Sequence, residues 1–110
     1  SFALVGFSQG AALSLQLNRL APDRFAATVS LAGFITPGDH AGDARLQAVR
    51  PPVFWGRGTA DTVIPAAAVD RTAQWMPAHT EPSIHIYEGL AHSISTQELS
   101  DLAAFLGEHL

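Results

Sequence analysis

The pentapeptide Gly6-Phe7-Ser8-Gln9-Gly10 joins a continuous apolar run, residues 2–7, to a segment with helical spacing. An unbroken apolar run is typical of a strand that is covered on both faces in a parallel sheet. A sharp strand-to-helix turn lifts its serine clear of the sheet, where a base can reach it. We expect such a turn to need glycine at positions 6 and 10, because it leaves no room for side chains. The junction therefore predicts an α/β fold with an exposed serine.

The rest of the chain alternates between strand and helix patterns. The segments that follow the first strand are a helix over 9–20, a strand over 26–31, a loop over 34–43, a strand over 52–56, a helix over 65–76, a strand over 83–87 and a last helix that begins at Ser95. Ser95 and Glu98 are spaced as a capping box. Strands separated by helices or long crossovers favour a parallel sheet. We expect about four parallel strands with helices on both faces.

Apolar stripes at helical spacing indicate which face of each helix packs on the sheet, and we interpret them as core rather than as ligand contacts. The expected inner faces are Ala12, Leu13, Gln16, Leu17 and Leu20 in the first helix, Val69, Ala73 and Met76 in the second, and Leu99, Leu102, Ala103, Leu106 and Leu110 in the last.

Composition removes several classes of function. The chain has 110 residues, a net charge of −4, no lysine and no basic cluster, so we expect no nucleic-acid partner. Its apolar runs are far shorter than the roughly 20 residues of a membrane span. Without cysteine it has no disulfide or thiolate metal site, and its histidines lack metal-binding spacing, so we expect no metal. The redox compartment stays open, and the cytoplasm is our expectation for its location.

A nucleophilic serine needs a histidine base and a carboxylate that orients it, and in this type of fold the chain order is serine, acid, histidine. Asp61 follows the third predicted strand, at the edge where open α/β sheets place ligands. His92 follows the fourth strand at the same edge. The alternatives are a turn-forming or helix-capping aspartate and an ordinary exposed loop histidine. We expect Ser8, Asp61 and His92 to be catalytic.

The other four histidines fit the role of base less well. His85 is in the middle of a strand, His109 is in the last helical turn, and His40 and His79 have no carboxylate in register. We expect His85 to pack or pair within the sheet, His109 to suit the helix dipole as a cation, and none of the four to be the base.

Two further groups of residues are candidates for contact with a substrate. The N–H of Gln9 follows the serine at a helix N-terminus, which suits a donor to a developing oxyanion. Apolar contacts to the acyl or leaving group are expected from Phe34, Ile35, Ile64 and Ile94, each of which is equally suited to plain core.

Three blocks of sequence resemble the phospholipase/carboxylesterase group, which includes the acyl-protein thioesterases. They are residues 6–15, 58–65 and 89–95 with Glu98-Leu99; Leu31 to Phe34 is also similar. The resemblance implies that Ser8, Asp61 and His92 form the triad, that the Gln9 N–H is one oxyanion donor, and that no cofactor is needed. One departure is Arg57, where the family usually has a His-Gly turn.

The sequence enters directly into an apolar strand. We therefore interpret the chain as a fragment. The resemblance implies that residues 1–110 are the C-terminal half of a single α/β-hydrolase domain, with the N-terminal strands and the loop of the second oxyanion donor absent. Such a fragment is expected to be weakly active at best. Its first strand would present an unpaired edge, which favours self-pairing and makes a homodimer possible.

Together these features predict a serine hydrolase that cleaves small-molecule carboxylic esters or thioesters through an acyl-serine intermediate. Two alternatives remain open at this point: a non-catalytic binding module of the same shape, and a serine peptidase of the same fold.

Overall fold

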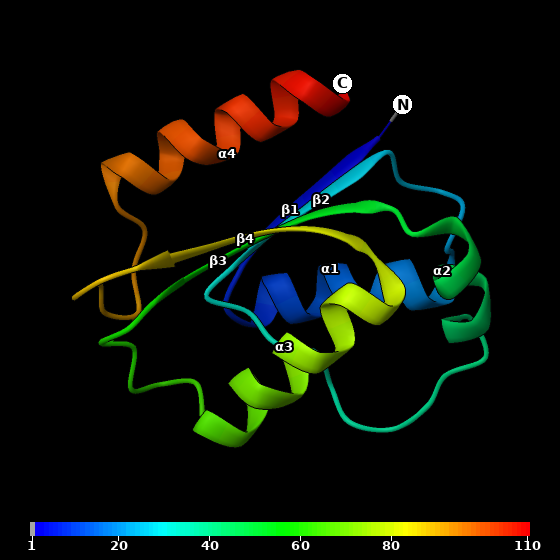
Figure 1. Ribbon diagram of the computed structural model, residues 1–110, viewed down its shortest axis with the longest axis horizontal. Helices are drawn as coiled ribbons and strands as arrows, with labels where there is room; N and C mark the ends of the chain where they lie inside the picture. The colour runs from blue at the N-terminus through cyan, green and yellow to red at the C-terminus, as the bar shows by residue number, and fades with distance from the viewer. Residues whose placement is uncertain (1) are drawn as a thin grey trace.

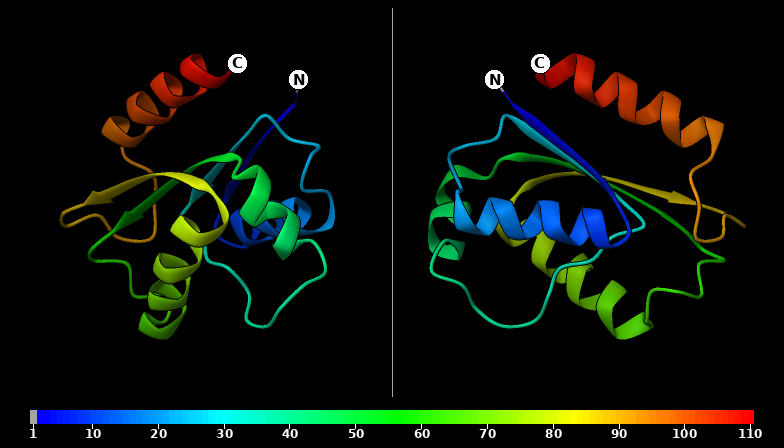
Figure 2. Two further views of the ribbon diagram at one scale, coloured as in Figure 1. Left: turned by 45° about the vertical axis from the view of Figure 1, so that its right-hand side comes forward. Right: turned by 180° about the vertical axis from the view of Figure 1, so that it is seen from behind.

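The computed structural model describes residues 2–110 and has one sheet of four parallel strands. In chain order and in spatial order these are β1 (Ala3–Phe7), β2 (Ala27–Leu31), β3 (Pro52–Gly58) and β4 (Glu81–Tyr87). The helices are α1 (Gln9–Leu20), α2 (Asp43–Val49), α3 (Ala66–His79) and α4 (Thr96–His109). Figures 1 and 2 show α1, α2 and α3 on one face of the sheet and α4 on the other. The predicted α/β fold, with helices on both faces, is confirmed.

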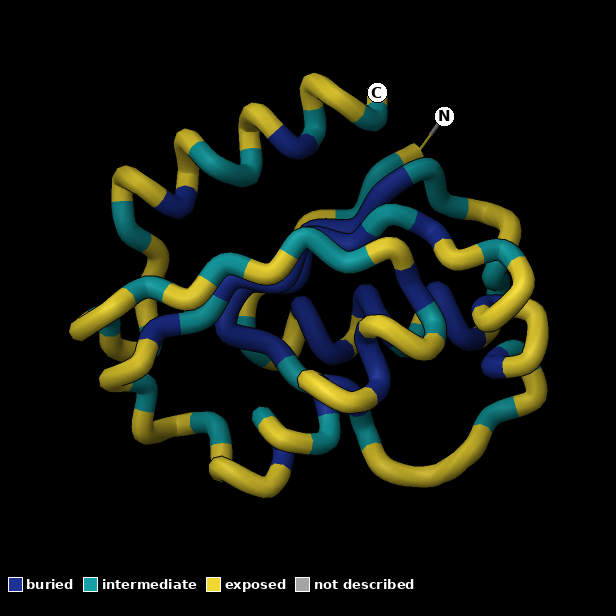
Figure 3. Tube along the Cα trace, in the orientation of Figure 1, coloured by how far each residue is buried: buried dark blue, intermediate teal, exposed yellow. Residues whose placement is uncertain are grey.

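Each face of the sheet has its own core, because successive side chains of a strand point to opposite faces. On β3, Val53 and Trp55 pack with Leu15 of α1 and Met76 of α3, whereas Phe54 packs with residues of α4. All five residues of β2 are buried, and the buried trace follows the middle of the sheet in Figure 3. The two central strands are therefore sandwiched between helical layers, as their apolar runs predict.

Two helical segments differ from the sequence prediction. The helix α2 follows the predicted loop and was not expected, since among its seven residues only Leu46 is a buried apolar side chain, too few for a visible stripe. The helix α3 continues three residues further than predicted, through Pro77 to His79. Within residues 2–110 no helix is both long enough and apolar enough to cross a membrane.

The buried face of α1 agrees with the prediction only in part: Ala12 is buried as expected, but the face is rotated away from the leucines of the predicted stripe. Leu13 and Leu20 are 62% and 73% exposed, whereas Leu15 and Asn18 are buried. Asn18 donates a hydrogen bond of 2.8 Å to the Thr28 hydroxyl on β2, which satisfies a polar group inside the core. Apolar periodicity cannot detect a face that is held partly by hydrogen bonds.

The predicted stripes of α3 and α4 are confirmed in part, since Met76 is buried and Val69, Leu102 and Leu106 pack against the two cores. In α4 the buried side chains are Glu98 and Phe105, whereas Leu99 is 53% and Leu110 64% exposed. In α3, Thr72 and Trp75 are buried and Ala73 is exposed. The capping box at the start of α4 is present as predicted, since the Ser95 hydroxyl accepts a hydrogen bond of 3.1 Å from the Glu98 N–H.

A buried ion pair fixes the long loop that leads to α2. The guanidinium of Arg19, at the end of α1, lies 2.9 Å from the Asp43 carboxylate, and the Arg19 side chain is only 2% exposed. The same guanidinium donates to the backbone carbonyls of Thr36 and Gly38. The loop is thereby held against the helical layer, although it is long and rich in glycine and proline.

Candidate active site

Ser8 occupies a strained turn between β1 and α1. Its backbone has φ 57° and ψ −117°, a combination that is unfavourable for a residue with a side chain. The Ser8 N–H donates 2.8 Å to the Leu31 carbonyl at the end of β2, which ties the turn to the sheet. A β-carbon on Gly6 would lie 2.3 Å from the Gly10 carbonyl oxygen, so the requirement for glycine at position 6 is confirmed. At Gly10 an added β-carbon would meet no atom within 4 Å, so the same expectation at position 10 is wrong.

The two carboxylate oxygens of Asp61 have different partners. Oδ1 accepts hydrogen bonds from the N–H groups of Val63, at 2.9 Å, and Ile64, at 3.3 Å. Oδ2 lies 2.8 Å from Nδ1 of His92. The turn-forming role that the sequence left as an alternative is therefore performed by one oxygen, and the other oxygen is bonded to the imidazole.

The imidazole of His92 bridges Asp61 and Ser8. Its Nε2 lies 2.9 Å from the Ser8 hydroxyl oxygen, across 84 positions of sequence. With Nδ1–H donating to the carboxylate, Nε2 is left as the acceptor of the serine proton. The imidazole also packs on the ring of Phe7, with ring centroids 4.9 Å apart. The three side chains form a continuous hydrogen-bonded chain, which is the arrangement that activates a serine hydroxyl in acyl transfer.

Hydrogen bonds from backbone N–H groups join the loop that carries the acid to the loop that carries the base. The N–H of Ala60 donates 3.0 Å to the Leu90 carbonyl, and the N–H of Gly89 donates 2.8 Å to the Thr59 hydroxyl. The loops are so close that a β-carbon on Gly58 would lie 1.9 Å from the Leu90 oxygen. The separation of Asp61 and His92 is therefore set by the loops as well as by their own contact.

Electrostatics keep the Asp61 carboxyl ionised. Burial by itself would raise the pKa of Asp61, but the hydrogen bonds from His92 and from the N–H groups of Val63 and Ile64 outweigh it and lower the pKa below its ordinary value. A carboxylate at this position stabilises the charged form of the imidazole that it touches.

The chain matches the phospholipase/carboxylesterase family over residues 1–110. It belongs to that family. The match extends over the chain and is not confined to the serine motif, and it agrees with the resemblance seen in the sequence.

The chain is also similar to individual proteins that are named as thioesterases or esterases. The chain is 35% identical over 109 residues to acyl-protein thioesterase 1 of Saccharomyces cerevisiae, covering 96% of this chain and 48% of the yeast protein. It is 31% identical to a probable carboxylesterase of Oryza sativa, covering 96% and 40%. The crystal structure of esterase PE8 superposes with a TM-score of 0.76 at 30% identity, covering 98% of this chain and 50% of that one. The chain thus spans about half the length of these relatives.

The other histidines of this family member have structural contacts. His85 stacks on Phe54 with centroids 4.5 Å apart, and His79 and His109 pack on aromatic rings of their own helices. His85 also lies between Ser83, at 3.1 Å, and Asp101, at 3.8 Å, but the second separation is too long for a hydrogen bond. Ser83 is inside a strand, with no turn to present it. Among residues 2–110 no group of three or more histidines and acids is placed to hold a metal ion.

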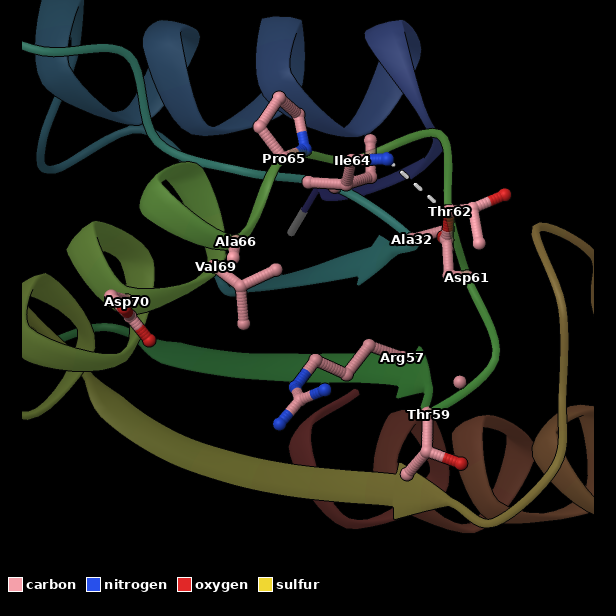
Figure 4. A pocket seen from close by; sticks show the side chains of 12 residues that line it. Ala32, Arg57, Thr59, Asp61, Thr62, Ile64, Pro65, Ala66, Val69 and Asp70 are labelled. Carbon is pink, nitrogen blue, oxygen red and sulfur yellow. Dashed lines mark hydrogen bonds between the residues drawn. The ribbon is translucent and has the colours of Figure 1, made fainter.

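A cavity of about 380 Å³ opens beside Asp61, between the end of β3 and the start of α3 (Figure 4). Of the four apolar residues expected at the substrate, only Ile64 lines it. Ile35 is 1% exposed and belongs to the core, Phe34 is half-buried, and Ile94 is 38% exposed.

The remaining wall of the cavity includes residues that were not assigned to a site from the sequence: Arg57, Pro65, Ala66, Val69 and Asp70. The sequence does single out Arg57, because it departs from the pattern of the family at that position. Val69 is expected in the core from the sequence. No pattern in the sequence indicated that β3 and α3 separate here to leave a cavity.

Gln9 is the first residue of α1, directly after the serine. The Ser8 side chain does not cap α1, because its hydroxyl is bonded to His92 instead. The N–H groups of the first turn, including that of Gln9, are therefore left without a side-chain acceptor at the positive end of the helix dipole.

Proposed function

We propose that the protein is a serine hydrolase that cleaves carboxylic esters or thioesters through an acyl-serine intermediate. The observation that carries the proposal is the hydrogen-bonded chain from Ser8 through His92 to Asp61, at 2.9 and 2.8 Å. The substrate class is supported by relatives that are named acyl-protein thioesterase and carboxylesterase. The cavity next to Asp61 offers room for part of such a substrate.

In the first step the Ser8 oxygen attacks the carbonyl carbon while Nε2 of His92 accepts the hydroxyl proton. The carbonyl electron pair moves onto oxygen. When this intermediate collapses, the bond to the leaving alcohol or thiol breaks, and His92 returns the proton to that group. Asp61 stabilises the imidazolium that exists between the two transfers.

In the second step a water molecule takes the place of the leaving group. His92 removes a proton from the water, the hydroxide oxygen attacks the acyl-serine, and the Ser8 oxygen leaves with the proton from His92. No cofactor takes part in either step.

The N–H of Gln9 is proposed as one donor to the oxyanion that forms in each step. It is adjacent to the attacking oxygen and lies at a helix N-terminus, where partial positive charge is concentrated. The strained Ser8 backbone forms the turn after which the helix begins directly with this N–H.

The test is covalent labelling of the protein expressed from its complete natural gene. A fluorophosphonate probe should label Ser8, and Ser8→Ala should abolish both labelling and ester hydrolysis. Absence of labelling in a folded wild-type protein would favour a binding module instead. A panel of aryl esters, acyl thioesters and peptides then ranks the substrate classes, and turnover of peptides alone would favour a peptidase.

A further inference from the structure

Arg57 is a cation without an acidic partner in the part of the chain that the structure describes. Its Nε is buried and has no hydrogen-bond acceptor. Within residues 2–110 the ion pairs shorter than 4 Å involve other side chains, and the recorded contact of the guanidinium is with the Trp55 ring, 5.8 Å from its centroid. Arg19 is different, since its buried guanidinium is paired with Asp43. A buried guanidinium N–H that lacks an acceptor is unfavourable, which points to a missing partner.

The side chain of Arg57 lines the cavity beside Asp61. It extends from β3 into the space below Val69 of α3 (Figure 4). Ile64 and Val69 give the cavity an apolar wall, and Pro65 and Ala66 place the start of α3 at its border. The first turn of α3 has no acidic residue and no side-chain cap, so the positive end of its dipole adds to the charge of Arg57.

Two acids also border the cavity, and neither neutralises Arg57. The Asp61 carboxylate is occupied by His92 and by two backbone N–H groups. Asp70 is exposed on the outer part of α3, further than 4 Å from any guanidinium nitrogen of Arg57. The arrangement is a cation inside a cavity that has an apolar wall on one side and an exposed acid at its border.

We propose that this cavity is a subsite for substrates that carry a carboxylate on a short apolar chain, with Arg57 binding the carboxylate. The inference rests on the proposed hydrolase function and narrows its substrate class. A planar guanidinium matches a carboxylate with two parallel hydrogen bonds, and the apolar wall accommodates the methylene groups that join the carboxylate to the scissile carbonyl. The carboxylate belongs either to the acyl group or to the leaving group.

Matched ester pairs test the proposal and distinguish these two sources. For the acyl group, the mono-4-nitrophenyl ester of adipic acid is compared with its methyl ester. For the leaving group, 5-acetoxy-2-nitrobenzoic acid is compared with its methyl ester. In one of the pairs kcat/KM for the anion should exceed that of the neutral ester by roughly ten- to a hundredfold, the range of a charge-assisted hydrogen bond.

Arg57→Met should abolish this preference, and Arg57→Lys should keep part of it. Arg24→Met is the matched control, because it removes the same charge from an exposed site outside the cavity and should leave the ratio unchanged. Asp70→Asn should increase the preference, since it removes the competing acid. An equal ratio in wild type and Arg57→Met, for both pairs, would overturn the proposal.

Binding to Ser8→Ala separates failure of the subsite from failure of the hydrolase function. Monomethyl adipate should shift the Arg57 Nε–Hε resonance in a saturable manner, and dimethyl adipate should not. Such binding in a protein that hydrolyses no ester would support the subsite and contradict the proposed function. Ester hydrolysis with neither charge preference nor a saturable shift would support the function and refute the subsite.

Discussion

Gly6 and Gly10 approach each other across the turn that presents Ser8, so that a β-carbon on Gly6 would lie 2.3 Å from the Gly10 carbonyl oxygen. The contact is one-sided, because a β-carbon on Gly10 would point into open space. The two glycines of the serine motif therefore differ in their physical role. One permits the close approach of strand and helix, and the other is free to change in this structure.

This asymmetry predicts opposite outcomes for two identical substitutions. Gly6→Ala should displace the turn and lower both stability and kcat, because the atom in its way belongs to the backbone. Gly10→Ala should keep the turn and stabilise α1 by about 0.5–1 kcal/mol, the usual difference between alanine and glycine in a helix. Urea unfolding and ester hydrolysis of both variants check this. Equal losses in the two variants would contradict it.

One Asp61 oxygen accepts from the loop backbone and the other contacts His92. Substitutions of Asp61 should therefore affect catalytic activity and folding stability to different extents. Asp61→Asn keeps an oxygen for the Val63 and Ile64 N–H groups, but it presents the wrong partner to His92. We expect kcat to fall by roughly 10⁴-fold with little change in unfolding free energy.

Asp61→Ala removes the turn bonds as well, so it should lose comparable activity and also about 1 kcal/mol of stability. Ester kinetics together with urea unfolding of both variants decide the point. A destabilised Asp61→Asn with near-normal kcat would show that the aspartate only shapes the loop.

The order of the four strands and the meeting of Ser8, Asp61 and His92 could be predicted, because both follow from rules of parallel sheets. In a parallel sheet the carboxyl ends of successive strands lie along one edge, so residues that follow different strands come together there. This rule alone is enough to predict that the loops after β1, β3 and β4 meet. Their closeness did not depend on the details of side-chain packing.

The face of α1 and the cavity of Arg57 could not be predicted, because both depend on contacts between distant segments. Asn18 is buried because Thr28 of β2 offers it a hydrogen bond, and apolar periodicity instead selected Leu13 and Leu17. The cavity is formed between the end of β3 and the start of α3, which are joined by the loop that carries Asp61. A single sequence contains no local signal for such a cavity.

Glu98 predicts a change of stability with pH. It is 1% exposed, and its Oε2 occupies the place that a side chain on Gly56 would take. Burial raises the pKa of Glu98 more than hydrogen bonding with the Ser95 backbone lowers it, and the neighbouring Asp101 carboxylate raises it further. The folded protein therefore keeps the Glu98 proton to higher pH than the unfolded chain does.

Stability contributed by a proton that is bound more tightly in the folded state is lost as pH rises above the ordinary glutamate pKa. Glu98→Gln cannot lose a proton, so its stability relative to wild type should increase from pH 4 to pH 7. Urea unfolding of both proteins across this range tests the expectation. Parallel pH profiles would show that Glu98 titrates normally.

The ion pair between Arg19 and Asp43 should matter far more than the ion pair between Arg45 and Asp23. In the first pair the arginine is 2% exposed, so Asp43→Asn would leave a buried charge without its partner. The expected loss is roughly 3–5 kcal/mol. Asp23→Asn removes the same charge from an exposed pair, in which both side chains are 59% accessible, and should change the unfolding free energy little.

Added salt should weaken the exposed pair and leave the buried one nearly unaffected, because ions screen charges mainly in solvent. Thermal and urea unfolding at low and high salt measure both effects, and similar losses for the two variants would show that the pair at Arg19 is solvated in solution.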